Sequence, residues 1–134
     1  MKDEIAALLR KAHRKLDAGC HSLAGGFPEE AASDAYYAMY HAAKAALLTR
    51  TPRVKQHGDV SRKFDQVLAD QGLVNPKYKE YLEHGLRERH LADYETDLTA
   101  TTSKEDAEQL LKEATEFVAI VEEFLKSEGG IIKS

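Results

Sequence analysis

The segment at residues 29–49, EEAASDAYYAMYHAAKAALLT, constrains the fold most, because apolar and aromatic side chains would lie nearly all the way round it as a helix. Such a helix is normally covered on several sides, so the segment predicts a central helix packed between other helices or against a second subunit. One polar strip remains, with members spaced three, four and three residues apart: Asp34, Tyr37, His41 and Lys44. That strip is either the solvent face of the helix or the wall of a groove or subunit contact.

Helical periodicity recurs along the chain, and no alternating strand pattern of useful length is present. Glycine, proline and capping residues bound the expected helices, which cover residues 3–24, 29–49, 59–70, 77–94 and a stretch after Ser103. The sequence therefore predicts an all-α fold, an antiparallel up-and-down bundle of four long helices plus one short helix. The 134 residues are expected to form a single domain, with residues 127–134 as a frayed tail.

Composition excludes several classes of protein. Hydrophobic residues make up 43% of the chain and charged residues 31%, a globular balance that argues against disorder. A net charge of −4 argues against coating nucleic acid by bulk attraction. No apolar run approaches the roughly 20 residues of a membrane helix, and the charged start of the chain does not resemble a signal peptide. With one cysteine there is no intrachain disulfide, so we expect a cytoplasmic protein without membrane contact.

The charge is unevenly distributed along the chain. Residues 50–63 hold five Lys or Arg against one Asp, whereas residues 103–128 hold eight acidic residues against three Lys. The basic segment is either a solvated loop or a place where the molecule meets a phosphate group.

An arginine stands in the apolar row of the helix expected at residues 77–94. Arg89 follows Leu82 and Leu86 on one side of that helix, and Asp93 lies one turn further on. A guanidinium among hydrophobic side chains costs several kcal/mol or more unless it is paired. Either Asp93 pairs with Arg89 and the pair is structural, or Arg89 faces a cleft and binds a phosphate through two parallel hydrogen bonds.

The sequence contains no motif that indicates a metal or cofactor site. The six histidines include no HExxH motif and no pair at i,i+4, so we predict no metal site and no cofactor. Cys20 falls on the apolar stripe of the first helix, which predicts packing rather than reactivity.

Three motifs in this order resemble the HEPN family (higher eukaryotes and prokaryotes nucleotide-binding), in its small stand-alone prokaryotic branch. They are SDAYYAMYHAAKAALL in the central helix, KQHGDVSRKF in the basic segment, and the R-x-x-A-D-Y pattern of residues 89–94. The resemblance covers residues 4–125. It implies a helical homodimer that is frequently paired with a minimal nucleotidyltransferase in a toxin–antitoxin operon.

The resemblance also implies a metal-independent ribonuclease motif, in which Arg is followed after four to six residues by His. The Arg carries over to Arg89, but Tyr94 stands after four intervening residues and no histidine follows His90. His41 or His57 would have to supply the imidazole from another element. Tyr94 is also of the residue type that a partner nucleotidyltransferase modifies with AMP in related toxins.

Two main hypotheses follow. The first is a toxin-like partner of a minimal nucleotidyltransferase that acts on RNA or a nucleotide, with ribonuclease activity left open. Its catalytic candidates are Arg89, Asp93 and Tyr94, and its ligand-binding candidates are Tyr37, His41, Lys44 and His57. The second is a non-catalytic module that binds a nucleotide or substrate, or a dimeric scaffold with no small ligand.

Overall fold

The computed structural model describes residues 2–51, 57–94 and 102–128, with the side chains of residues 2, 57–59 and 91–94 left undescribed. Its elements are α1 (Lys2–Ala24), α2 (Pro28–Leu47), α3 (His57–Lys63), the π-helical turn η1 (Phe64–Ala69), α4 (Lys77–Tyr94) and α5 (Lys104–Ser127). The described residues contain no strand, so the all-α prediction is confirmed for them. Within the same residues, no helix is long and apolar enough to cross a membrane.

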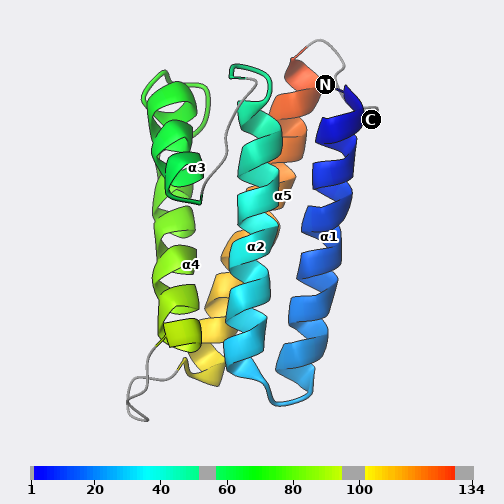
Figure 1. Cartoon of the computed structure of the whole chain (residues 1–134), viewed down its shortest axis with the longest axis vertical. Helices are drawn as coiled ribbons and strands as arrows, with labels where there is room; N and C mark the ends of the chain where they lie inside the picture. Colours follow the sequence, from blue (N-terminus) through cyan, green and yellow to red (C-terminus); the bar gives the residue numbers. More distant parts are fainter. Residues whose placement is uncertain (1, 52–56, 95–101, 129–134) are drawn as a thin grey trace.

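The four long helices lie side by side, and α2 contacts each of the other three (Figure 1). In Figure 1, α1 descends, α2 returns, α4 descends and α5 ascends behind α2. This arrangement confirms the prediction that α2 is the central helix. Alanine makes the close contacts possible, because eight alanines of α2 are completely buried: Ala31, Ala32, Ala35, Ala38, Ala42, Ala43, Ala45 and Ala46.

Local signals account for the helix ends. Gly26 and Gly72 follow α1 and η1 with φ values of +88° and +75°, a conformation that glycine adopts without a steric penalty. The Ser103 side chain accepts a 3.0 Å hydrogen bond from the Asp106 backbone N–H and caps α5, as its position predicts.

The short helix expected at residues 59–70 is divided into α3 and η1. A hydrogen bond of 2.7 Å joins the Asp70 backbone N–H to the Asp65 carbonyl, five residues earlier, and widens the turn. Phe64 and Leu68 are both completely buried in this wider turn.

The prediction that Cys20 packs in the core is wrong, because its side chain is exposed. The buried face of α1 passes through Leu16 and then Gly19 rather than Cys20. A Cβ atom at Gly19 would lie 2.7 Å from the Leu111 Cδ2 atom, so α1 approaches α5 closely at this turn. Gly19 takes the inward position, and Cys20, the next residue, lies on the surface.

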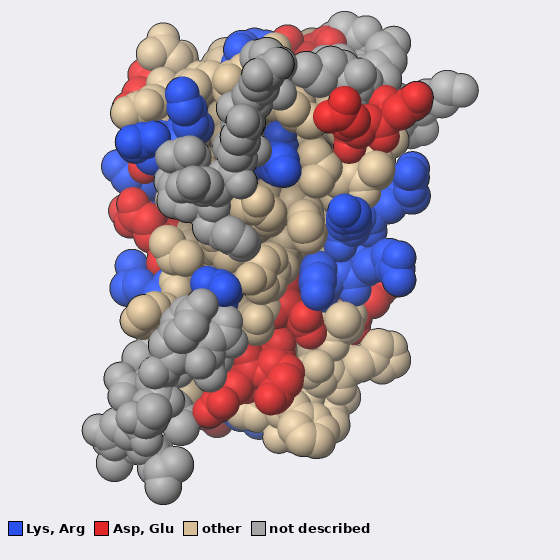
Figure 2. Space-filling view, viewed as in Figure 1, with Lys and Arg blue, Asp and Glu red and all other residues tan. Residues whose placement is uncertain are grey.

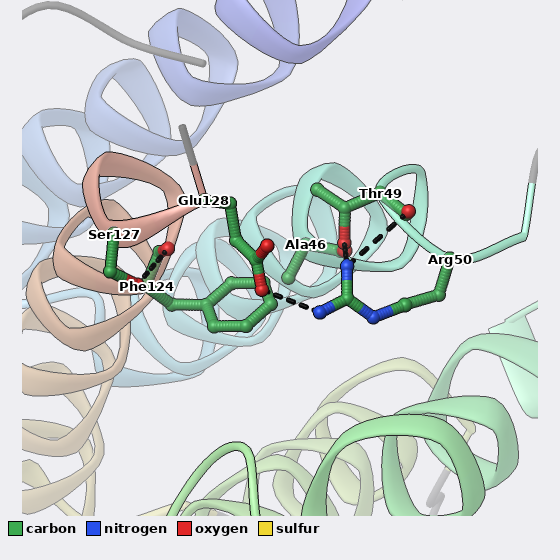
Figure 3. A network of polar contacts seen from close by, with 6 residues as sticks. All are labelled: Ala46, Thr49, Arg50, Phe124, Ser127 and Glu128. Carbon is green, nitrogen blue, oxygen red and sulfur yellow. Dashed lines mark hydrogen bonds and ion pairs between the residues drawn. The ribbon is translucent and has the colours of Figure 1, made fainter. Parts of the chain in front are cut away.

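The ends of α2 and α5 are joined by one arginine (Figure 3). The Nη2 atom of Arg50 lies 2.5 Å from Glu128 Oε1, and its guanidinium lies 5.7 Å from the centre of the Phe124 ring. Arg50 begins the basic segment predicted from the sequence, and here it serves an internal contact. Residues 52–56 of that segment, and residues 129–134 of the expected tail, lie outside the described part of the chain.

Candidate functional site

The polar strip of α2 and the arginine of α4 meet in the structure. All four residues of the strip are partly buried, and Arg89 is partly buried as well. The Arg89 guanidinium carbon lies 5.3 Å from the centre of the Tyr37 ring and 5.8 Å from that of Tyr36. A cation over aromatic faces is attracted by the ring quadrupoles, so part of the cost of placing Arg89 in the apolar row is offset by α2.

A glycine on α4 brings Arg89 to this position. Gly85, one turn earlier, is buried, and a Cβ atom there would lie 2.7 Å from the Met39 methyl carbon and 3.3 Å from Tyr36 Cδ1. The absence of a side chain lets α4 approach α2 closely at this turn. Arg89 follows four residues later on the same side of α4 and therefore reaches the two tyrosine rings.

Aromatic side chains form a cluster along α2. The Tyr37 ring centre lies 5.2 Å from that of Tyr36, 6.2 Å from that of Tyr40 and 6.4 Å from that of His41. The Tyr40 and His41 ring centres are 5.4 Å apart. The structure thus brings together three predicted site residues, Arg89, Tyr37 and His41, with Tyr37 in the middle.

A second cation reaches Tyr37 from α1. The Nζ atom of Lys15 lies 5.7 Å from the Tyr37 ring centre and 3.6 Å from Asp34 Oδ1. Burial raises the pKa of the Asp34 carboxyl, and the charge of Lys15 opposes that rise. Tyr37 therefore contacts one cation from α1 and one from α4.

A hollow of about 450 Å³ lies between α1 and α2, and we call it the basic cleft. It is lined by Lys11, Arg14, Lys15, Ala18 and His41. Figure 2 shows Lys and Arg side chains gathered over the middle of α1, beside the tan surface of α2. A second hollow of about 220 Å³ continues from Lys11 and includes Lys44, another residue of the predicted strip.

Sequence reasoning missed Tyr36 and the cations of α1. A signal for the latter was present, since the stretch RKAHRK at residues 10–15 has four basic residues and no acidic one. Lys11, Arg14 and Lys15 have the spacing i, i+3, i+4, which places them on one side of a helix. Nothing in the local sequence shows that this side faces the polar strip of α2.

Three predicted site residues cannot be placed in this arrangement. The side chains of Asp93, Tyr94 and His57 lie outside the described residues, although their backbones belong to α4 and α3. The pairing of Arg89 with Asp93 therefore stays a prediction.

A separate polar network joins α4 to α5. His84 Nδ1 lies 2.8 Å from Glu113 Oε1, and His84 Nε2 lies 3.7 Å from Glu88 Oε1. The Thr102 hydroxyl, almost completely buried, donates a 3.0 Å hydrogen bond to Glu88. Throughout the described residues, no group of three His, Cys, Asp or Glu is placed to hold a metal ion. This network positions α4, the helix that carries Arg89, against α5.

The environment of Tyr36 leads to a prediction about pH. Burial raises the pKa of Tyr36 to about 12, with the Arg89 guanidinium opposing the rise. An unfolded tyrosine ionises near pH 10, so the stability that the neutral phenol contributes is complete below about pH 10 and is lost as pH rises toward about 12. We expect Tyr36→Phe to flatten the fall of unfolding free energy across that window, measured by urea denaturation at a series of pH values.

Tyr81 provides the matched control, because a hydrogen bond with Glu116 raises its pKa to about 12 without contact to Arg89. Arg89→Ala should raise the pKa of Tyr36 further and leave that of Tyr81 unchanged. Identical pH profiles for wild type and Tyr36→Phe would contradict the buried, neutral phenol.

The chain is similar to a known family of proteins. The HEPN domain family model matches residues 5–124. "Putative toxin MJ0605" of Methanocaldococcus jannaschii is 32% identical over 126 residues, which cover 94% of this chain and 92% of that protein. "Putative toxin MJ0142" of the same organism is 31% identical, with 94% and 84% covered. "UPF0332 protein glr0978" of Gloeobacter violaceus is 30% identical, with 93% and 98% covered.

Proposed function

The chain belongs to the HEPN family, and from this membership we propose that it is the toxin-like component of a toxin–antitoxin module and that it acts on RNA. Two similar proteins of Methanocaldococcus jannaschii carry the word toxin in their names, which supports the first part of the proposal. The face formed by α2, α4 and α1 supports the second.

The observation that carries the RNA target is the position of Arg89 beside Tyr37. A guanidinium can hold a phosphate through two parallel hydrogen bonds, and a tyrosine ring can stack on any base because every base has a π-face. Arg89 and Lys15 both lie within 6 Å of the Tyr37 ring centre. The cations can bind phosphates while the ring stacks on a base, and phosphates and bases alternate in this way along single-stranded RNA.

The same face holds groups suited to RNA cleavage without a metal. In that reaction the 2′-hydroxyl gives its proton to a base and attacks the adjacent phosphorus. The bond to the 5′-oxygen of the next nucleotide then breaks as that oxygen takes up a proton. In our proposal Arg89 stabilises the charge that builds up on the phosphate, and His41 supplies the imidazole that the family motif lacks after Arg89.

Incubation of the purified protein with a mixed RNA pool in EDTA tests this function. We expect cleavage to persist in EDTA, because no metal takes part in the proposed reaction, and to require His41. A His41→Gln variant is expected to lose cleavage, whereas His21→Gln, on the exposed end of α1, retains it. Absence of both cleavage and RNA binding in the wild-type protein would contradict the proposal.

One observation favours a second candidate function, a non-catalytic module that binds RNA or a nucleotide. Tyr94 occupies the position where the family motif has histidine, and a tyrosine with an ordinary pKa near 10 is a poor base at neutral pH. Binding without cleavage in the same assay would support this candidate over the first.

The assembly around the toxin belongs to the same proposal. We propose a cytoplasmic homodimer of antiparallel up-and-down bundles, with a minimal nucleotidyltransferase as the antitoxin and Tyr94 as a residue that it modifies with AMP. These points rest on the family membership of the chain. A neighbouring reading frame that encodes a short nucleotidyltransferase would support the partnership directly.

A further inference from the structure

We infer that the basic cleft between α1 and α2 binds the phosphate backbone of single-stranded RNA and guides it toward Tyr37 and Arg89. The inference rests on the proposed function, since it takes RNA as the target. None of the site residues predicted from the sequence lies on α1. The inference therefore adds a binding surface on that helix.

The cations of the cleft are available to a ligand. Lys11 and Arg14 are exposed, and within the described residues neither takes part in an ion pair. Lys15 already forms an ion pair with Asp34, with its Nζ atom 3.6 Å from Asp34 Oδ1. Two of the three cations on this side of α1 can therefore bind phosphate groups without first breaking an ion pair.

The basic cleft and a second hollow share a lining residue on α1. Lys11 lines both the basic cleft and the second hollow, which also contains Lys44 and, at its far end, Glu4. Lys11 and Arg14 are separated by nearly one helical turn, about 5 Å along the axis of α1. Cations spaced along the two hollows that Lys11 lines can bind successive phosphates, which a site for a single phosphate would not require.

Aromatic groups beside the cleft favour RNA over an anionic membrane surface. His41 lines the cleft, and Lys15 lies over the Tyr37 ring, so stacking groups for bases adjoin the cations. A helix that binds a membrane surface inserts its apolar face between lipids. The apolar face of α1, with Ile5, Leu9 and Leu16, is instead buried in the protein core.

The test measures binding of a fluorescein-labelled single-stranded RNA of mixed sequence by anisotropy, at several salt concentrations. The double variant Lys11→Ala/Arg14→Ala is compared with Lys112→Ala/Lys126→Ala, which removes two exposed cations from α5. Each phosphate contact on a single strand contributes about 0.7 to the salt slope, so losing two contacts should lower the slope by about 1.4. Affinity should fall about 25-fold at 0.1 M salt relative to the control.

Equal RNA affinities for the two double variants would overturn the inference. Arg89→Ala, measured in parallel, separates it from the proposed function. If the cleft variant loses affinity while Arg89→Ala keeps both RNA affinity and cleavage, the cleft is supported and the role of Arg89 fails. If the wild-type protein binds no RNA, both fail. Binding to vesicles that contain phosphatidylserine is measured as well. If Lys11→Ala/Arg14→Ala loses vesicle binding without losing RNA binding, the cleft is assigned to membranes and the inference is overturned.

Discussion

Arg89→Ala is expected to lower the rate of RNA cleavage by about 100- to 1,000-fold, the usual effect of removing one group that stabilises charge in a transition state. The residue contacts Tyr36 and Tyr37 across the interface of α4 with α2, and in the proposed function its guanidinium binds the phosphate there. Initial cleavage rates of the wild-type and Arg89→Ala proteins on a defined RNA in EDTA measure the size of this fall. Growth inhibition on expression in a bacterial host should disappear with the same substitution.

Two further variants make this result interpretable. Arg89→Lys keeps the positive charge but cannot form two parallel hydrogen bonds to one phosphate, so we expect it to recover only a small part of the activity. Lys112→Ala removes an exposed cation from α5 and should keep full activity. Full activity in a folded Arg89→Ala protein would contradict the proposed role.

A structural role for Arg89 gives a different result. If Arg89 pairs with a buried Asp93, as its i,i+4 spacing allows, the Ala variant leaves that carboxylate unpaired and loses about 3–5 kcal/mol of stability. Urea denaturation of the variant, followed by circular dichroism, measures this loss. A stable variant without activity assigns Arg89 to the site, whereas an unstable one assigns it to the fold.

Phe117→Ala is expected to destabilise the protein by about 3–5 kcal/mol, the range for removing a buried aromatic side chain. Phe117 on α5 is completely buried, with its ring centre 5.2 Å from that of Phe64 in η1 and 6.1 Å from that of Tyr78 in α4. Its removal leaves a cavity where three elements meet. The free energy of unfolding from urea titration measures the effect.

Ile120→Ala is the matched control on the same helix. Ile120 is partly buried at the edge of the core, so its truncation should cost clearly less than that of Phe117. A loss below about 1 kcal/mol for Phe117→Ala would contradict the burial of Phe117 against Phe64 and Tyr78.

Secondary structure was largely predictable because its signals are local. The predicted range 77–94 has the same ends as α4, and Ser103 caps α5 as expected. Gly26 and Gly72 adopt positive φ after α1 and η1, a local signal for the end of a helix. The π-helical turn was missed, because the wider turn brings Phe64 and Leu68 into a core made by other helices.

The candidate site was predictable only in its separate parts. The strip of α2 and the unusual position of Arg89 both follow from helical spacing within one element. The spacing suggested Asp93 as the partner of Arg89, and it could not indicate Tyr36 and Tyr37, which lie on another helix. Contacts of this kind depend on how far one helix is from the next and how each is rotated about its axis.

The sequence by itself determined that this protein is all-α, approximately where its long helices begin and end, and that α2 is central. These features follow because backbone conformation and the periodicity of apolar residues act over a few neighbouring positions. The tertiary structure decided which side chains meet. Gly19 and Gly85 let α1 and α4 approach their neighbours, leaving Cys20 exposed and bringing Arg89 to the tyrosines of α2. Lys15 reaches Tyr37 from α1 for the same reason, since only packed helices place residues distant in sequence within a few ångströms.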